Sequence, residues 1–174
     1  EIALLNKYDT IITLSKNDKK KLESAGVSTL IVPSFAIVQD KYTFKVPTKS
    51  TNIITFVGPE EHIPNKMGVE WFINNCLESL RKKEPTIEFR IIGNWSEATR
   101  KKYSSQTYIH FCGFVDDLQA ALQNTVMIVP IMIGSGIRMK ILEAASMGVP
   151  FVTTTVGVEG IPFVNGEECI IADS

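Results

Sequence analysis

The sequence has few of the features that mark secreted or membrane proteins. Its 174 residues include only three cysteines, Cys76, Cys112 and Cys169, which are widely spaced and odd in number. They provide neither a disulfide framework nor the spacing of a metal site, and this usage fits a reducing compartment. No apolar run reaches membrane-spanning length, and the first residues lack the charged and apolar regions of a signal peptide. We therefore expect a cytoplasmic protein without a transmembrane segment.

The sequence also lacks an excess of charge of either sign. Its 18 lysines and arginines are balanced by 19 aspartates and glutamates, which gives a net charge of −1 at pH 7. Such a surface has no general attraction for nucleic acid, so we exclude nucleic acid as a partner. A hydrophobic content of 44% and a charged content of 21% are typical of a globular domain. Because the first residue is Glu1 rather than Met, we expect a segment of a larger protein.

What the sequence does contain is a regular alternation of strand-like and helix-like segments. Apolar and β-branched runs that end near glycine or proline predict strands, and amphipathic or capped segments predict helices. The predicted strands are 10–14, 30–32, 52–57, 87–92, 108–111, 125–129, 150–153 and 169–171. The predicted helices are about 17–25 (capped by Asn17 or Asp18), 69–80, 96–104, 116–122 (capped by Asp116) and 138–147, and 34–51 is interpreted as a linker. This alternation predicts an α/β fold with a Rossmann-like, doubly wound parallel sheet.

The stretch 134–143 carries the clearest indication of a ligand. Gly134 and Gly136 lie in a loop between a predicted strand and a predicted helix. A helix that begins after such a loop directs unpaired N–H groups and the positive end of its dipole at the loop, where phosphate groups bind. Lys140 and Glu143 share one helix face, and they suit the phosphates and the ribose hydroxyls of a nucleotide. The same residues are also compatible with an ordinary turn and a surface salt bridge.

A dinucleotide-dependent dehydrogenase is disfavoured. Met139 stands where the dinucleotide fingerprint has its third glycine. The strand 150–153 runs into Thr154 and Thr155 rather than the acidic residue that holds an adenosine ribose. The loop therefore predicts a nucleotide site of another kind.

Several motifs follow one another in an order that matches a known family. They are Phe56-Val57-Gly58, Pro64-Asn65, Trp71-Phe72, Arg90-Ile91-Ile92-Gly93, Phe111-Cys112-Gly113-Phe114-Val115-Asp116, Val129-Pro130, Gly134-Ser135-Gly136-Ile137-Arg138-Met139-Lys140-Ile141-Leu142-Glu143-Ala144, Met147-Gly148-Val149-Pro150 and Thr154-Thr155-Val156-Gly157-Val158-Glu159-Gly160. Over about residues 50–174 this ordered set resembles the C-terminal half of GT-B glycosyltransferases of the group-one (family four) type. The resemblance implies that residues 1–48 are a remnant of the N-terminal acceptor domain and hinge. It implies that residues 49–174 are a nucleotide-sugar-binding domain, truncated at its C-terminal end.

The resemblance also implies a chemistry. Such a domain binds a UDP-, GDP- or ADP-linked sugar for retaining transfer to an acceptor hydroxyl, with no obligatory metal and no cofactor. The family's ribose-binding carboxylate corresponds to Glu143. Its phosphate-binding loop corresponds to Gly134, Ser135, Gly136 and Ile137. The loop that holds the base through backbone groups corresponds to Gly113, Phe114 and Val115.

Two positions depart from the family pattern. Ser135 stands where the family often has a glutamate near the donor sugar. Pro59 replaces the arginine that in many members follows the first glycine, here Gly58. The side chains left to bind the phosphates are then Lys66, Arg138 and Lys140, together with the loop amides.

We therefore predict the donor-binding half of a hexosyltransferase-type glycosyltransferase. The acceptor site and the catalytic residues, which are unassigned, are expected in the missing N-terminal domain, which could also attach the protein peripherally to a membrane. The segment alone is expected to bind nucleotide weakly and to transfer no sugar. A GT-B-shaped epimerase or phosphorylase, a non-enzymatic nucleotide-binding module and a structural interaction domain are the alternatives.

Overall fold

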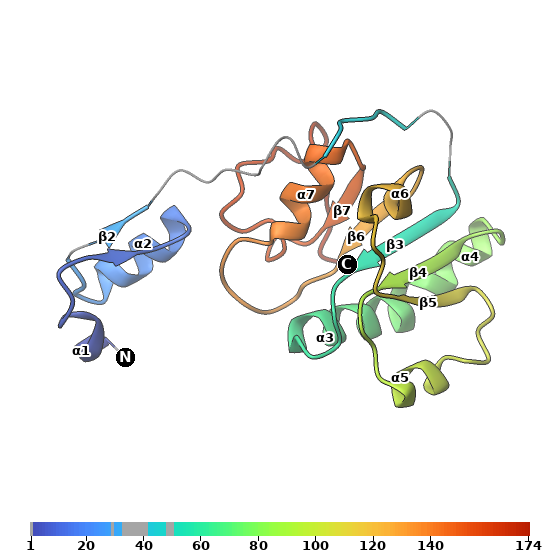
Figure 1. Ribbon diagram of the computed structural model, residues 1–174, viewed down its shortest axis with the longest axis horizontal. Coiled ribbons are helices and arrows are strands. Elements are labelled where there is room, and N and C mark those ends of the chain that lie inside the picture. The colour runs from blue at the N-terminus through green and yellow to red at the C-terminus, as the bar shows by residue number, and fades with distance from the viewer. Residues whose placement is uncertain (1, 29, 33–41, 48–50) are drawn as a thin grey trace.

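The computed structural model describes residues 2–28, 30–32, 42–47 and 51–174, and its strands form two parallel sheets (Figure 1). The smaller sheet consists of β1 (Ile11–Ile12) and β2 (Leu30–Ile31), and α1 (Ile2–Leu5) and α2 (Lys16–Ser24) accompany it. The two predicted strands are thus present but shorter than predicted. Figure 1 shows these four elements as a group beside the larger sheet.

The larger sheet has six parallel strands, in the spatial order β5-β4-β3-β6-β7-β8. They are β3 (Ile53–Val57), β4 (Glu88–Ile92), β5 (Ile109–Gly113), β6 (Val126–Val129), β7 (Phe151–Thr153) and β8 (Ile170–Ile171). Every adjacent pair is parallel, which confirms the predicted α/β fold with a parallel sheet.

The strand order also fixes where a ligand can bind. From β3 the chain builds outward through β4 to β5, and then returns to the other side of β3 with β6. In parallel sheets a crevice forms beyond the carboxyl ends of the two strands at which the order reverses. Here those strands are β3 and β6, which end at Val57 and Val129.

One long helical stretch covers a face of this sheet and differs from its prediction. It consists of α3 (Ile63–Phe72), η2 (Ile73–Leu77), a π-helical turn, and α4 (Glu78–Lys83). The helix begins six residues before the predicted 69–80 because Pro64 occupies its first turn, where a missing N–H costs nothing. The apolar periodicity of the sequence does not reveal this turn, because its apolar residues Ile63 and Met67 are exposed.

The remaining helices are short, and two predicted caps are wrong. They are α5 (Glu97–Lys102), α6 (Leu118–Leu122) and α7 (Met139–Met147). Asp117, not Asp116, caps α6, because its carboxylate accepts the Ala120 N–H at 2.9 Å. Ser15 caps α2, because its hydroxyl accepts the Asp18 N–H at 3.0 Å, which leaves Asp18 and Asn17 inside the helix. Gly148 ends α7, as predicted, in the left-handed conformation.

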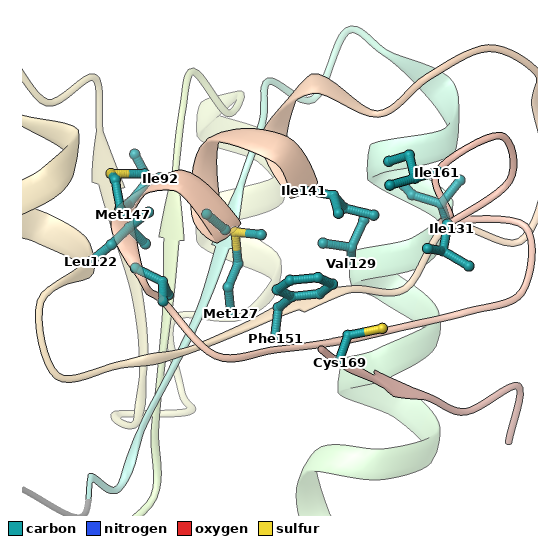
Figure 2. Close-up of a cluster of buried hydrophobic side chains, with 13 residues drawn as sticks. Ile92, Leu122, Met127, Val129, Ile131, Ile141, Met147, Phe151, Ile161 and Cys169 are labelled. Carbon is teal, nitrogen blue, oxygen red and sulfur yellow. The ribbon is translucent and has the colours of Figure 1, made fainter. Parts of the chain in front are cut away.

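The core consists of two clusters on opposite faces of the sheet, since successive side chains of a strand point to opposite sides. Ile128 packs in the cluster beneath α3 and η2, whereas its neighbours Met127 and Val129 pack in the cluster beneath α7. Figure 2 shows the second cluster, in which Ile141 and Met147 of α7 lie above the sheet. Its buried members are Ile92, Leu122, Met127, Val129, Ile131, Ile141, Ala144, Met147, Val149, Phe151, Val158, Ile161 and Cys169. This packing fixes the position of α7 relative to the strand ends.

Residues 42–47, within the predicted linker, run along α6 and α7. The Lys45 N–H donates to the Met147 carbonyl at 3.1 Å, and the Thr43 N–H donates to the Gln119 side chain at 3.2 Å. The rest of that linker, and the predicted domain boundary at residues 48 and 49, fall largely outside the described residues. None of the helices in the described ranges combines the length and apolar content that a membrane span requires.

Candidate functional site

The loops after β3, β4 and β5 meet at the carboxyl edge of the sheet. The Gly58 N–H donates to the Ile92 carbonyl at 2.8 Å, and the Gly93 N–H donates to the Gly113 carbonyl at 2.7 Å. Because β6 also pairs with β3, the loop that leads into α7 lies at the same edge. The predicted glycine-containing loops are thus brought together at the point of strand-order reversal.

A cavity of about 570 Å³ opens at this edge. Four of the predicted site residues line it: Gly58, Phe114, Val115 and Glu143. The other lining residues are Tyr42, Val57, Pro59, Ile92, Gly93, Asp116, Asp117, Leu118 and Gln119. Its volume lies within the range of small-molecule sites, about 300–1,000 Å³. Phe114 is 78% exposed at this cavity, so its ring is open to a ligand.

Glu143 lies on the wall of the cavity and is held there by a tyrosine. The Tyr42 hydroxyl donates to Glu143 Oε1 at 3.0 Å. Sequence reasoning missed Tyr42, because it lies in an aperiodic segment, and only the course of residues 42–47 along α7 brings it here. The salt bridge considered as an alternative is not formed: Lys140 and Glu143 both lie in the described part of the chain, and no ion pair joins them.

Lys140 instead points toward the loop after β3. Its Nζ donates to Asn65 Oδ1 at 2.9 Å and lies 4.4 Å from the centroid of the Phe56 ring. Burial, and secondarily the charge of Arg138, lower the pKa of Lys140 to about 7. A Cβ on Gly58, whose φ is +149°, would lie 2.7 Å from this Nζ and 2.6 Å from Asn65 Nδ2. Only glycine therefore lets the loop pass this close to the lysine.

Arg138 is folded against the loop that precedes α7. Its side chain is 9% exposed, and Nη1 donates to the carbonyls of Ser135 at 2.6 Å and Gly136 at 2.5 Å. Nε and Nη2 are buried and have no hydrogen-bond partner among the residues that the structure describes. Buried N–H groups without a partner are rare in proteins and call for a ligand or another explanation. The loop 134–137 thus wraps around a guanidinium that has unused donors.

Arg138 and Lys140 share a further property: neither forms an ion pair with a carboxylate in the described ranges. Both lie at the start of α7, where the helix dipole adds further positive potential. Uncompensated cations at such a place are unfavourable until an anion binds. This part of the site is therefore suited to phosphate.

Lys66, the third predicted phosphate ligand, has a different environment. Its Nζ forms an ion pair with Glu60 Oε1 at 2.8 Å, and Glu60 also accepts hydrogen bonds from the Thr99 hydroxyl at 2.7 Å and the Ser96 N–H at 2.6 Å. Burial alone would raise the pKa of Glu60, but hydrogen bonds from Lys66, Thr99 and Ser96 lower it to about 2. The charge of Lys66 is thus already compensated, and its role as a phosphate ligand stays a prediction.

The chain matches the family model of group 1 glycosyl transferases over residues 51–174. Among curated proteins, it is 26% identical over 176 residues to an uncharacterized 44.6 kDa protein in the cps region of Klebsiella pneumoniae. That alignment covers 95% of this chain and 44% of the relative, so the chain spans less than half of the relative's length.

Two solved structures show the same fold. TarM is similar with a TM-score of 0.79 at 15% identity, over 99% of this chain and 35% of TarM. HepE of Anabaena, in a complex with UDP and glucose, is similar with a TM-score of 0.76 at 13% identity, over 98% of this chain and 51% of HepE. At these identities the likeness establishes the GT-B fold alone. Because the family model covers residues 51–174, most of the chain, the protein belongs to the group 1 glycosyltransferases.

Proposed function

We propose that this chain is the donor-binding part of a glycosyltransferase and binds a nucleoside diphosphate sugar at the carboxyl edge of the larger sheet. The observation that carries the proposal is a pair of cationic side chains, the buried Arg138 and the half-buried Lys140, which have no carboxylate partner in the described ranges and lie at the start of α7. A diphosphate provides the missing negative charge. HepE, which shares the fold, was crystallised with UDP-glucose, and this supports the same class of donor here.

The adjoining cavity accounts for the rest of the nucleotide. Glu143 presents a carboxylate to the ribose hydroxyls, and Phe114 and Val115, which line the cavity, are assigned to the base from the family resemblance. With the diphosphate between Lys140 and the loop 134–137, the sugar extends toward Ser135, whose short side chain leaves the donor sugar without a carboxylate contact there. The transferred hexose and retention of its configuration are carried over from the family resemblance.

The chemical contribution of this half is electrostatic. When the bond between the sugar and the diphosphate breaks, negative charge builds on the leaving phosphate. Buried cations and preorganised amides stabilise such charge strongly, because they do not have to reorganise as the reaction proceeds. Arg138, Lys140 and the amides of the loop 134–137 are placed for this role. The acceptor hydroxyl and the group that receives its proton belong to the other domain of the whole protein.

The N-terminal residues fit this division. The group around β1 and β2 exposes several large apolar side chains, namely Leu4, Ile12, Leu14 and Ile31. Exposed apolar clusters of this kind mark surfaces that contact other elements. This supports the assignment of residues 1–48 to the acceptor domain and hinge, and of residues 49–174 to the donor domain, with membrane association, if any, through the acceptor domain.

Calorimetric titration of the chain with UDP, GDP and ADP tests the proposal. We expect one of the three to bind and Glu143→Ala to weaken its binding about tenfold or more, since a charged hydrogen-bond acceptor is lost. Glu78→Ala, on the exposed surface of α4, is the matched control and should bind like the wild type. Equal binding by Glu143→Ala would contradict the ribose assignment, and no binding of any nucleotide would favour a structural interaction domain.

The whole protein separates the remaining alternatives. We expect it to transfer sugar from the nucleotide that binds, and the 174-residue chain to transfer none. An epimerised or phosphorolysed product would indicate the corresponding enzyme instead. Nucleotide binding without any turnover would indicate a non-enzymatic nucleotide-binding module.

A further inference from the structure

Asn65 is a buried polar residue whose side-chain amide both donates and accepts a hydrogen bond. It lies on the first turn of α3 and is 4% exposed. Its Nδ2 donates to the Pro59 carbonyl at 3.0 Å, and its Oδ1 accepts from Lys140 Nζ at 2.9 Å. The carbonyl and the ammonium together fix the orientation of the amide, because each has only one compatible partner atom on it. Asn65 therefore ties the loop after β3 to the lysine of α7.

The other neighbours of Lys140 hold its ammonium without neutralising it. The Phe56 ring, which is fully buried, attracts a cation through its face but carries no charge. Of the three N–H donors of Lys140, Asn65 uses one within the described residues. The two remaining donors are available to an anion at the end of β3.

The charged groups around Lys140 leave its charge unopposed. Arg138, in the loop before α7, is the only described residue whose charge shifts the pKa of Lys140, and it lowers it further below the value set by burial. On the same helix, the Glu143 carboxylate accepts from Tyr42. On α3, Lys66 is paired with Glu60. With a pKa of about 7, Lys140 is only partly protonated near neutral pH when no anion is bound.

We propose that Asn65 is a positioning residue that holds Lys140 against the diphosphate site, and that binding of a nucleoside diphosphate sugar is coupled to the uptake of one proton by Lys140. The inference rests on the proposed function and adds to it a residue and a pH dependence. The diphosphate favours the charged lysine, so a neutral Lys140 takes a proton from solvent when the ligand binds. Asn65 makes this possible because an uncharged acceptor orients the ammonium without raising its pKa as a carboxylate would.

Titration calorimetry with a sugar nucleotide tests the coupling. The probe is UDP-glucose, GDP-mannose or ADP-glucose, according to the base that binds, because a diphosphate diester does not itself titrate near neutral pH. At about pH 7.5, in two buffers of different ionisation enthalpy, we expect the heat to show uptake of up to one proton. Between about pH 6 and about pH 8 we expect the affinity to fall about tenfold, the change in the protonated fraction of a group whose pKa is about 7.

Variants of Asn65 test its positioning role. In Asn65→Asp a carboxylate faces Lys140, so we expect a permanently charged, paired lysine, no proton uptake, and affinity that is about tenfold lower at pH 6 and independent of pH. Asn65→Ser, which is too short to reach the ammonium, should also lose the proton uptake, and it serves if the aspartate variant does not fold. The matched control is Asn75→Asp, an exposed asparagine farther along the same helical stretch, which should behave as the wild type.

The outcomes separate this inference from the proposed function. If Asn65 only ties the loop to α3, its variants will lose thermal stability but keep the wild-type proton uptake and pH dependence, and the positioning role is then wrong. Binding of the sugar nucleotide with no proton uptake in the wild type overturns the coupling and leaves the proposed function intact. Absence of binding by all three sugar nucleotides overturns both.

Discussion

Two lysines at the same edge of the sheet, Lys66 on α3 and Lys140 on α7, occupy opposite electrostatic environments. The side chain of Lys66 is 45% exposed, and its hydrogen bond and ion pair with Glu60 raise its pKa. Lys140 is largely buried beside an uncharged amide and an aromatic ring, and its burial lowers its pKa to about 7. A paired lysine stabilises the fold, whereas a buried lysine without a carboxylate lowers stability until an anion binds. Their positions in sequence do not distinguish them, but their partners do.

Exchanging each lysine for methionine should separate the two roles and produces the largest expected effect. We expect Lys140→Met to weaken nucleoside diphosphate binding about tenfold to hundredfold, because a charge-assisted hydrogen bond contributes about 1.5–3 kcal/mol. Its thermal stability without ligand should be unchanged or higher, since an uncompensated buried charge is removed. Titration calorimetry and thermal unfolding of the same samples provide both quantities.

Lys66→Met is the matched variant for this comparison. We expect it to lower the thermal stability slightly, through the loss of its ion pair, and to change nucleotide affinity less than about threefold. A hundredfold loss of affinity in Lys66→Met would show that the ion pair with Glu60 opens when the ligand binds. The contrast between the two lysines would then be a property of the ligand-free state alone.

The central strands of the larger sheet, β3 and β6, were predictable because they are largely covered on both faces and consist of apolar and β-branched residues. The run Ile53 to Val57 is an example, and Gly58 marks its end clearly. The helix boundaries were harder to predict from the sequence. The first turn of α3 exposes Ile63 and Met67, which breaks the apolar periodicity, and caps such as Ser15 depend on hydrogen bonds that the sequence leaves open among neighbouring polar residues.

Glu143 and Phe114 were predicted as site residues from the resemblance to the family, and both line the cavity. Tyr42 was not, because it reaches Glu143 from 101 residues away through an aperiodic segment. The state of Lys140 was also hidden, because it depends on Asn65, 75 residues earlier in the sequence. Spacing locates a cation, but only the contact between Asn65 of α3 and Lys140 of α7 shows which partner it has.

The ion pair between Lys66 and Glu60 leads to a second prediction with a smaller effect, which concerns how the stability of the fold depends on pH. The pKa of Glu60 is about 2 in the folded chain and about 4.5 when unperturbed, so its carboxylate favours the folded state above about pH 4.5. That contribution, about 1–2 kcal/mol, should be lost as the pH falls from 4.5 toward 2. Glu60→Gln should be less stable than the wild type at pH 7 and should approach it at pH 3, as measured by urea unfolding.

A matched variant distinguishes this network from general acid sensitivity. Glu78→Gln removes an exposed carboxylate of α4 whose partner, Lys82, is also exposed. Its urea midpoint should follow the wild type at each pH. If the difference in stability between Glu60→Gln and the wild type does not change with pH, the charge of the Glu60 carboxylate does not stabilise the contact between α3 and α5. Lys66 would then have to be regarded as a cation that is as available as Lys140.

The smallest expected effect concerns an anionic residue at the same edge of the sheet, Glu143, and its hydrogen-bond partner Tyr42. The Tyr42 hydroxyl donates to Glu143 Oε1 at 3.0 Å, and we expect a ribose hydroxyl to compete with it for this carboxylate. Tyr42→Phe removes the competing donor and keeps the ring, and we expect it to raise nucleotide affinity about twofold to tenfold, the value of one neutral donor's hydrogen bond. Titration with the nucleotide that binds measures it. A lower affinity in Tyr42→Phe would mean that the hydroxyl contacts the ligand and that the segment 42–47 completes the site.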